Sequence, residues 1–166
     1  MARKIRLLIV DDEPVFLETL TDRLLLRHFK VTPVSNGADA LLAAQRKDFD
    51  IALVDLQMPG ITGEDVLNKL KEMHPLLEVI ILTGHGSIES AIRCTQAGSF
   101  TYLEKPCELD RMLEVLQEAY QKRLQRKFQV DREKMRKMLG LALVESPMGV
   151  IKRLKEFDEN GSREAD

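Results

Sequence analysis

Five short, mostly apolar runs constrain the fold of this 166-residue chain more than any other feature. They occupy residues 5–10, 31–34, 51–54, 79–82 and 100–103, and turn or polar residues follow each of them. A short continuous apolar run is typical of a strand that is buried on both faces. Such strands occur in parallel sheets, where helices cover both faces.

Stretches with helical periodicity separate these predicted strands. Pro14 is a residue favoured in the first turn of a helix, and Ser87 is a predicted N-cap. In the helix after Ser87, the apolar residues Ile88, Ala91 and Ile92 are predicted to face the core. The predicted helices lie between residues 14 and 25, 38 and 46, 62 and 74, 87 and 98, and 109 and 120.

The alternation of strands and helices predicts an α/β fold with a doubly wound parallel sheet of five strands. Elements of this length fit one domain over residues 1–125, followed by a helical extension over residues 126–166. A short helix is predicted after Ser146 and Pro147, with apolar residues up to Phe157. The last eight residues, 159–166, form a predicted polar tail.

Composition excludes several classes of protein. Hydrophobic residues make up 44% of the chain and charged residues 31%, which is typical of a globular protein. The net charge of −2 argues against a general attraction to nucleic acid or membranes, and no apolar run approaches the ~20 residues of a membrane span. Cys94 and Cys107 have no metal-ligand spacing, so they are predicted to be free thiols in the cytoplasm.

The charge is unevenly distributed along the chain. Residues 1–120 carry 13 Lys and Arg against 19 Asp and Glu, whereas residues 121–140 carry 8 against 2. Apolar residues such as Leu124, Phe128 and Met135 continue the helical spacing towards Gly140 or Val144. This stripe can pack against a second copy, giving a homodimer through residues 109–144, or against another protein. Alternatively, the basic residues contact nucleic acid, or they are merely solvated.

Polar residues at the ends of the predicted strands indicate the chemistry. Asp11 and Asp12 follow the first strand, Asp55 the third, Thr83 the fourth and Lys105 the fifth. The carboxyl ends of parallel strands meet at one edge of the sheet, where ligands bind. At ~4 Å and an effective dielectric constant of about 20, each pair of carboxylates costs on the order of 4 kcal/mol. Mg²⁺ would offset this repulsion, and the whole set suits phosphoryl transfer to a carboxylate.

These residues lie in segments that resemble the receiver domain of bacterial two-component response regulators. The segments are Leu-Ile-Val-Asp-Asp-Glu at 8–13, Val-Asp-Leu-Gln-Met-Pro-Gly at 54–60, Leu-Thr-Gly-His-Gly at 82–86 and Tyr-Leu-Glu-Lys-Pro at 102–106. The resemblance spans about three quarters of the chain, and the segments occur in the family's order. It implies a flavodoxin-like sheet with strand order 2-1-3-4-5.

The resemblance also implies a role for each site residue. Asp55 would accept a phosphoryl group from a sensor histidine kinase or a phosphotransfer protein. Mg²⁺ would be bound by Asp12, Asp55 and the backbone carbonyl of Gln57, with Asp11 acting through water. Lys105 would hold the phosphate with Thr83. The peptide bond to Pro106 would be cis, and Thr83 and Tyr102 would form the switch.

Two further positions and two rival functions complete the predictions. Gln57 and His85 flank the expected path of the water that hydrolyses the acyl phosphate, so we predict that they tune its lifetime; solvated loop residues are the alternative. The chain has no recognisable DNA-binding or enzymatic output, which predicts a non-enzymatic regulator acting through protein contacts. The rivals are a nucleic-acid-binding regulator and a Mg²⁺-dependent phosphohydrolase with an aspartyl nucleophile. Such hydrolases place a second Asp where this chain has Gln57.

Overall fold

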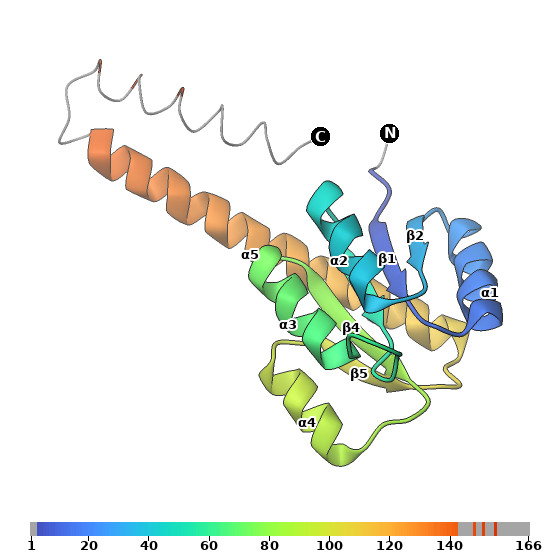
Figure 1. The fold of residues 1–166 in the computed structure, drawn as a ribbon. Helices are drawn as coiled ribbons and strands as arrows, with labels where there is room; N and C mark the ends of the chain where they lie inside the picture. The colour runs from blue at the N-terminus through green and yellow to red at the C-terminus, as the bar shows by residue number, and fades with distance from the viewer. Residues whose placement is uncertain (1–2, 143–147, 149–150, 152–154, 156–166) are drawn as a thin grey trace. The chain divides into compact units, whose positions relative to one another are not determined.

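The computed structural model describes residues 3–142, 148, 151 and 155. It divides into two compact units, residues 1–123 and 124–166. The first unit contains a five-stranded sheet in which all neighbouring strands are parallel, in the order β2-β1-β3-β4-β5. The predicted flavodoxin-like strand order is therefore confirmed (Figure 1). The strands are β1 (Arg6–Val10), β2 (Lys30–Val34), β3 (Ile51–Val54), β4 (Glu78–Thr83) and β5 (Thr101–Glu104).

Helices cover both faces of this sheet. One face packs against α1 and α5 through buried residues that include Leu24 and Leu116. The other packs against α2, α3 and α4 through residues that include Ala44, Leu67 and Cys94. Burial on both faces explains why β1, β3 and β4 are almost continuously apolar. The helices are α1 (Pro14–Leu25), α2 (Gly37–Arg46), α3 (Gly63–Met73), α4 (Ile88–Gln96) and α5 (Leu109–Ala142).

Local sequence signals set the starts of the helices. Asn36, Thr62 and Ser87 are the N-caps of α2, α3 and α4, and each side chain accepts a hydrogen bond from the backbone N–H three residues later. Ser87 and Ser90 form a capping box, in which each side chain accepts a bond from the other residue's N–H. Pro14 occupies the first turn of α1, as its fixed φ favours.

The prediction that the isoleucines of α4 face the core is wrong. Ile88 and Ile92 are 79% and 51% exposed, whereas Ser90 and Cys94 are the buried residues of this helix. A helix that approaches the sheet through small residues comes closer to it than one that presents branched apolar side chains. Hydrophobicity alone therefore selected the wrong side of α4.

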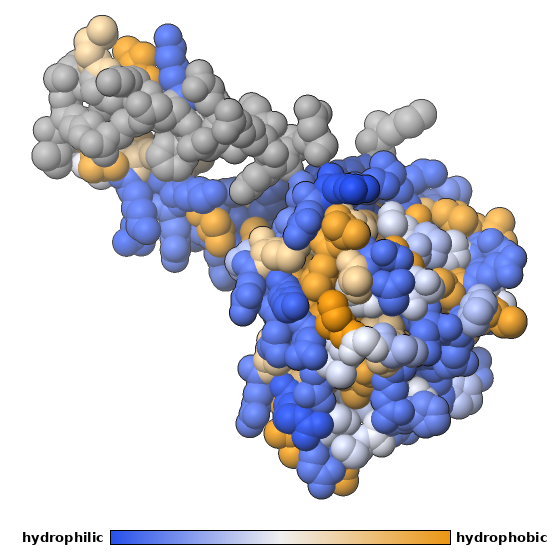
Figure 2. Space-filling model, in the orientation of Figure 1, coloured by the Kyte–Doolittle hydropathy of each residue, from blue (hydrophilic) through white to orange (hydrophobic). Residues whose placement is uncertain are grey.

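Helix α5 belongs to both units, because residues 109–123 lie in the first and residues 124–142 in the second. Its exposed apolar residues include Leu124, Phe128 and Met135, at 48%, 68% and 62%. Apart from residues 148, 151 and 155, the helix predicted after Ser146 and the polar tail lie outside the described residues. No described helix combines the length and apolar character needed to cross a membrane. The view in Figure 2 shows a mostly hydrophilic surface with smaller groups of hydrophobic residues between.

Candidate functional site

Three carboxylates meet at the carboxyl edge of the sheet. Asp11 follows β1 directly and Asp55 follows β3, and hydrogen bonds along the strand ends hold both backbones in place. One oxygen from each of Asp11, Asp12 and Asp55 lies within 4.8 Å of the others. Asp11 and Asp55 are buried, at 2% and 5% exposure. The structure thus brings together the acidic residues that the sequence places on two different strands.

Lys105 is the positive charge of this cluster. Its Nζ lies 2.6 Å from Asp11 Oδ2, 3.1 Å from Glu13 Oε1 and 3.8 Å from Asp55 Oδ2. The same ammonium lies 4.1 Å from the centre of the Phe16 ring, on α1. The carboxylates and the ring face of Phe16 together fix the position of the ammonium next to Asp55. The Lys105–Pro106 peptide bond is cis.

Burial and hydrogen bonding act in opposite directions on the pKa values of Asp11 and Lys105, the partners of the shortest ion pair. Burial raises the pKa of Asp11 above its ordinary value, and it outweighs the hydrogen bonds from Lys105 and the Glu13 N–H, which lower it. Burial lowers the pKa of Lys105, but its hydrogen bonds to Asp11 and Glu13 outweigh this and raise the pKa overall. Burial therefore dominates the pKa of Asp11, whereas the ion pairs with Asp11 and Glu13 dominate that of Lys105.

The donor set fits a hard divalent cation. Asp55 Oδ1 is buried and has no hydrogen-bond partner among the described residues, although a buried carboxylate oxygen normally has one. The ligand atoms on offer are all carboxylate oxygens, which Mg²⁺ prefers to nitrogen or sulfur. A cation bound here would give Asp55 Oδ1 a partner and would offset the repulsion between Asp11 and Asp55.

The loop after β4 contacts the hydroxyl group predicted to bind phosphate. Thr83 is fully buried, and its Oγ1 accepts a hydrogen bond from the backbone N–H of His85 at 3.2 Å. The backbone carbonyl of Thr83 accepts a bond from the N–H of Lys105 at 2.9 Å. Thr83 is therefore tied to the ends of both β4 and β5, beside the carboxylate cluster.

The same loop also contacts Tyr102. The Tyr102 hydroxyl is buried and has no hydrogen-bond partner among the described residues. A Cβ added to Gly86 would overlap this hydroxyl oxygen and would lie 2.6 Å from Cζ of the ring. Gly86 thus leaves the space that the phenol fills. Thr83 and Tyr102 contact neighbouring residues of one loop.

A second glycine permits a close approach at Asp55. A Cβ on Gly63, the first residue of α3, would overlap the backbone oxygen of Asp55 and lie 2.7 Å from Cα of Leu56. The N–H of Gly63 also donates to the carbonyl of Leu56 at 2.9 Å. Gln57 and His85, the residues predicted to tune the phosphate lifetime, have exposed side chains in the loops after β3 and β4.

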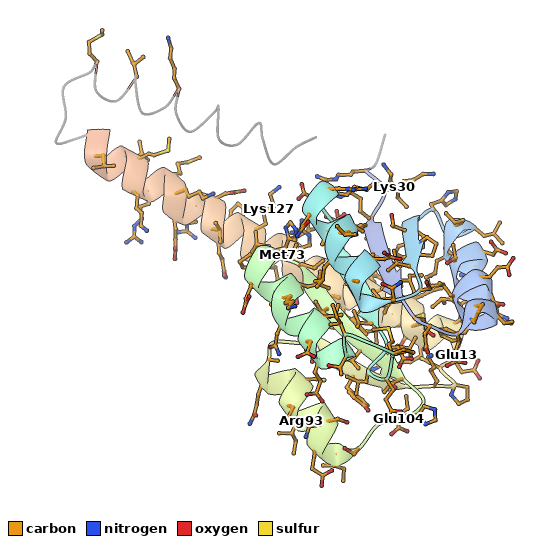
Figure 3. All side chains as sticks on the ribbon, viewed as in Figure 1. Glu13, Lys30, Met73, Arg93, Glu104 and Lys127 are labelled. Atoms are coloured by element: carbon orange, nitrogen blue, oxygen red, sulfur yellow. The ribbon has the colours of Figure 1, made fainter. Side chains whose placement is uncertain are left out.

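Sequence reasoning missed the roles of Glu13 and Phe16 in this site. Glu13 lies at the start of α1 (Figure 3), where it shares the Lys105 ammonium with Asp11. The acidic run of residues 11–13 contained a signal for Glu13, whereas an apolar residue such as Phe16 gives no sign in the sequence that it will contact an ammonium. Gly63 and Gly86 carried no signal, because their importance depends on which residues the fold brings near them.

A separate charged cluster lies at the opposite edge of the sheet. Asp50, directly before β3, is buried and accepts hydrogen bonds from the backbone and side chain of Arg6 and from Arg123 Nε at 3.0 Å. Arg123 Nη1 also lies 3.5 Å from the carbonyl oxygen of Leu76. Burial alone would raise the pKa of Asp50, but the bonds from Arg6 and the charge of Arg123 lower it overall. This cluster fixes Arg123, the last residue of the first unit.

Comparison with known proteins places this chain in a family. A profile of the response regulator receiver domain matches residues 7–117. The transcriptional regulatory protein GlrR of Escherichia coli K12 is 35% identical over 113 residues, which cover 68% of this chain and 26% of GlrR. The regulatory protein LuxO of Vibrio parahaemolyticus is 38% identical over 98 residues, covering 59% of this chain and 22% of LuxO. The chain spans about a quarter of the length of these curated relatives.

Solved structures show the same architecture. A CheY-like response regulator receiver domain from Methanospirillum hungatei JF-1 superposes with a TM-score of 0.73 and 26% identity, covering 75% of this chain and 99% of that one. The signal receiver domain of a LuxO repressor protein from Vibrio parahaemolyticus gives a TM-score of 0.71, again with 26% identity, covering 76% and 97% of the two chains. The likeness thus extends over nearly the whole of each isolated domain.

Proposed function

Since this chain belongs to the response regulator receiver family, we propose that Asp55 accepts a phosphoryl group from a sensor histidine kinase or a phosphotransfer protein. The position of Lys105 carries this proposal, because its ammonium lies within 4.0 Å of both Asp11 and Asp55. In the transfer, the P–N bond of a phosphohistidine breaks and a P–O bond forms to Asp55. The product is an acyl phosphate.

Lys105 and Thr83 would hold the transferred group. The ammonium of Lys105 stabilises negative charge on the phosphoryl oxygens, and the Thr83 hydroxyl donates a hydrogen bond to one of them. The oxygen of this hydroxyl now accepts a hydrogen bond from the N–H of His85, which leaves its own proton free to be donated to the phosphate. Water later hydrolyses the acyl phosphate, returning the Asp55 carboxylate and inorganic phosphate.

The residues that would hold Mg²⁺ are Asp12, Asp55 and the backbone carbonyl of Gln57, with Asp11 acting through a water molecule. When bound, the ion supplies positive charge that neutralises the phosphoryl oxygens. Asp11 also orients Lys105 through their 2.6 Å ion pair. The three carboxylates thus have different tasks: Asp55 reacts, Asp12 binds the cation and Asp11 positions the ammonium.

The readout would be a change in protein contacts. If Thr83 moves towards the phosphate, its bond to the N–H of His85 would draw the loop after β4 with it, and this loop also confines Tyr102. Phosphate need only favour one arrangement of Thr83 and Tyr102 over the other for the populations to shift. Such a shift would alter the surface formed by α4 and β5.

We assign the receiver domain to residues 1–125 and a helical extension to residues 126–166. The exposed apolar residues of α5 support a homodimer through residues 109–144. A cytoplasmic location would suit contact with the kinase. The protein would act as a phosphoacceptor that catalyses only its own phosphorylation and dephosphorylation. Gln57 in place of a second Asp argues against phosphohydrolase activity, which turnover of a phosphate monoester would reveal.

A second candidate function is nucleic-acid binding through the basic part of α5. The relative GlrR is named a transcriptional regulatory protein, and residues 121–140 of this chain carry 8 Lys and Arg against 2 Asp and Glu. Retention of the chain by duplex DNA, lost as salt is raised, would support this candidate.

Intact mass spectrometry tests the main proposal. After incubation with acetyl phosphate and Mg²⁺, we expect the parent chain to gain one phosphoryl group and the Asp55→Asn variant to gain none. Asp48→Asn is a matched control, because Asp48 lies before the same strand at the opposite edge of the sheet, and it should be phosphorylated normally. Equal labelling of the parent and Asp55→Asn would place the reaction elsewhere. No labelling by either acetyl phosphate or the cognate kinase would overturn the proposal.

A further inference from the structure

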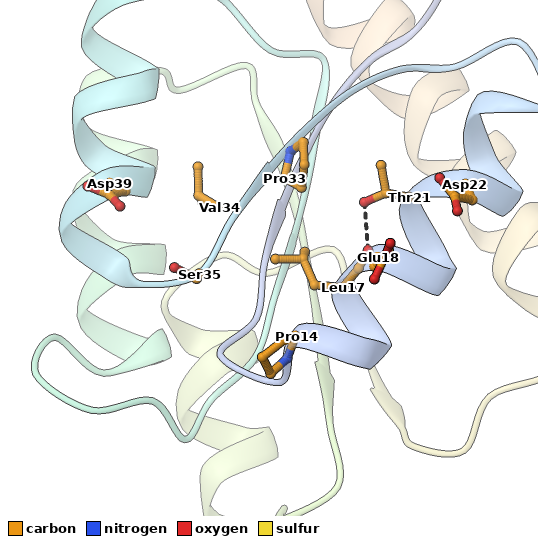
Figure 4. A pocket seen from close by; sticks show the side chains of 9 residues that line it. All are labelled: Pro14, Leu17, Glu18, Thr21, Asp22, Pro33, Val34, Ser35 and Asp39. Atoms are coloured by element: carbon orange, nitrogen blue, oxygen red, sulfur yellow. Dashed lines mark hydrogen bonds between the residues drawn. The ribbon is translucent and has the colours of Figure 1, made fainter.

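A groove of about 500 Å³ separates α1 from the end of β2 and the start of α2 (Figure 4). Its apolar lining comes from Pro14 and Leu17 on α1 and from Pro33 and Val34 on β2. β2 is an edge strand, since it pairs only with β1. The groove therefore lies at the border of the sheet, on elements that contribute neither Asp55 nor Lys105.

Among the described residues, three carboxylates line the groove and no Lys or Arg does: Glu18 and Asp22 come from α1, and Asp39 comes from α2. Asp39 accepts a hydrogen bond from the side-chain amide of Asn36, but none of the three forms an ion pair within the described part of the chain. Glu18 and Asp22 are four residues apart, so they lie one turn apart on the same side of α1. Like charges at this spacing destabilise a helix unless a cation lies nearby.

The basic part of α5 carries positive charges at the same spacing as the carboxylates of α1. Arg132 and Arg136 are also four residues apart, and both are exposed. Successive residues of an α-helix are turned by about 100° around its axis. Seen along the axis of α5, Arg132 and Arg136 lie on the same side as Phe128, Met135 and Leu139, within a sector of about 100°. These three apolar side chains are 68%, 62% and 62% exposed. One side of α5 thus combines apolar surface with two guanidinium groups one turn apart.

We propose that residues 128–139 of one copy dock into the groove between α1 and β2 of a second copy. This inference rests on the self-association proposed above and names the surface that α5 would contact. Arg132 and Arg136 would pair with Glu18 and Asp22, relieving the repulsion within each helix. Phe128 and Met135 would cover the apolar lining of the groove. The spacing of the charges, one turn on both helices, sets the register.

Sedimentation velocity of the full chain, at low and high salt, measures the association. We expect a dimer that weakens as salt is raised, because its ion pairs are screened. The isosteric pair Glu18→Gln with Asp22→Asn should raise the dissociation constant about tenfold, as should Arg132→Gln with Arg136→Gln. Two controls remove the same charges elsewhere and should leave the constant unchanged: Glu72→Gln with Asp110→Asn, and Lys134→Gln with Lys137→Gln.

Charge reversal gives the decisive comparison. One variant carries Glu18→Arg and Asp22→Arg, and the other carries Arg132→Glu and Arg136→Glu. Each should be monomeric alone, because its groove and its α5 have the same sign. Their equimolar mixture should form a 1:1 dimer, because each groove then meets an α5 of opposite charge. Dimers of the first variant alone, as direct pairing of two α5 helices predicts, would overturn the proposal, and so would a parent that stays monomeric.

Phosphorylation separates this inference from the proposed function. Glu18 and Asp22 are exposed and have no contact with Lys105 in the structure. The two neutralised variants and the two charge-reversed variants should therefore gain one phosphoryl group from acetyl phosphate at the rate of the parent. This result would also show that these variants are folded. Lost association with normal phosphorylation is the expected result. Normal association with lost phosphorylation would contradict the receiver chemistry and leave the groove contact in place.

Discussion

The hydroxyl oxygen of Tyr102 lies where the side chain of any other residue at position 86 would begin. Gly86 leaves this space open, and the phenol is buried there without a hydrogen-bond partner among the described residues. The backbone N–H of His85, one residue earlier, donates to Thr83. The loop therefore connects the two predicted switch residues, which come from different strands.

Gly86→Ala should displace the Tyr102 ring. Tyr102 and Tyr120 are the two tyrosines of a chain without tryptophan, so a Tyr120→Phe background isolates the fluorescence of Tyr102. In that background we expect Gly86→Ala to increase quenching by acrylamide, because the added methyl group overlaps the buried hydroxyl. Gly84→Ala is the matched control, since its Cβ would meet Cβ of Lys105 at an ordinary 3.9 Å. Equal quenching in both variants would contradict this prediction.

Asp50→Ala should be strongly destabilising. The substitution leaves Arg6 and Arg123 without the buried carboxylate that both contact. Breaking a buried ion pair of this kind costs on the order of 3 kcal/mol of unfolding free energy. Urea denaturation would measure the loss. Asp48→Ala, which removes a longer and more exposed contact to Arg6 at 3.8 Å, should cost much less.

The stabilisation from Asp50 should disappear in acid. The pKa of Asp50 is lowered in the folded protein from its ordinary value of 3.8, so its carboxylate stabilises the fold at pH values above 3.8. That contribution is lost as the pH falls through the lowered folded value. The stability difference between the parent and Asp50→Asn should thus narrow below about pH 3.8. A constant difference down to pH 2 would assign the effect of the substitution to packing.

Mg²⁺ should stabilise the fold through the carboxylates at the other edge. A ligand at a hundred times its dissociation constant adds about 2.7 kcal/mol, which corresponds to a rise of several degrees in Tm. We expect this rise in the parent and a much smaller one in Asp12→Asn, as followed by circular dichroism during heating. Asp110→Asn, at the start of α5, should respond as the parent does. An equal rise in Asp12→Asn would exclude that residue from the site.

Gln57 and His85 should control the lifetime of phosphorylated Asp55. Replacing both by Ala removes two exposed side chains from the loops beside Asp55, so the hydrolytic water should reach the phosphorus more easily. We expect dephosphorylation to be several times faster, measured by intact mass after the phosphodonor is removed. Gln117→Ala, on the exposed side of α5, should not alter the rate. An unchanged rate in the double variant would show that both are merely solvated loop residues.

The sequence predicted the strands well because burial on both faces leaves little choice of residue. Ile51–Val54 must be apolar in a sheet covered on two sides, and the structure places this strand as predicted. Helix α4 shows where the same reasoning fails. Its inner side consists of small residues, and its isoleucines are exposed, so a hydrophobic pattern selects the wrong side. The distance between a helix and the sheet decides which side of the helix is buried, and a hydrophobic pattern does not contain this distance.

The site shows a similar division. Asp11, Asp55 and Lys105 follow predicted strands, so the topology alone brings them to one edge. The contact of Lys105 with Phe16 and the space that Gly86 leaves for Tyr102 depend on atomic positions in separate elements. The Asp50 cluster was also missed, because Arg123 lies 73 residues from its partner. The meeting of strand ends at one edge of the sheet can be predicted from the sequence. Other contacts between residues far apart in the chain can be found only in the three-dimensional structure.

The first part of helix α5 runs between the two edges of the sheet in the receiver unit. The helix begins at Leu109, shortly after Lys105, and its contact with Asp50 through Arg123 is at the opposite edge of the sheet. These 15 residues span ~22 Å at the rise of an α-helix. Within the first unit, one continuous helix therefore links the neighbourhood of the carboxylate cluster to the buried Asp50 cluster. A displacement of α5 near one of these clusters must then be accommodated at the other.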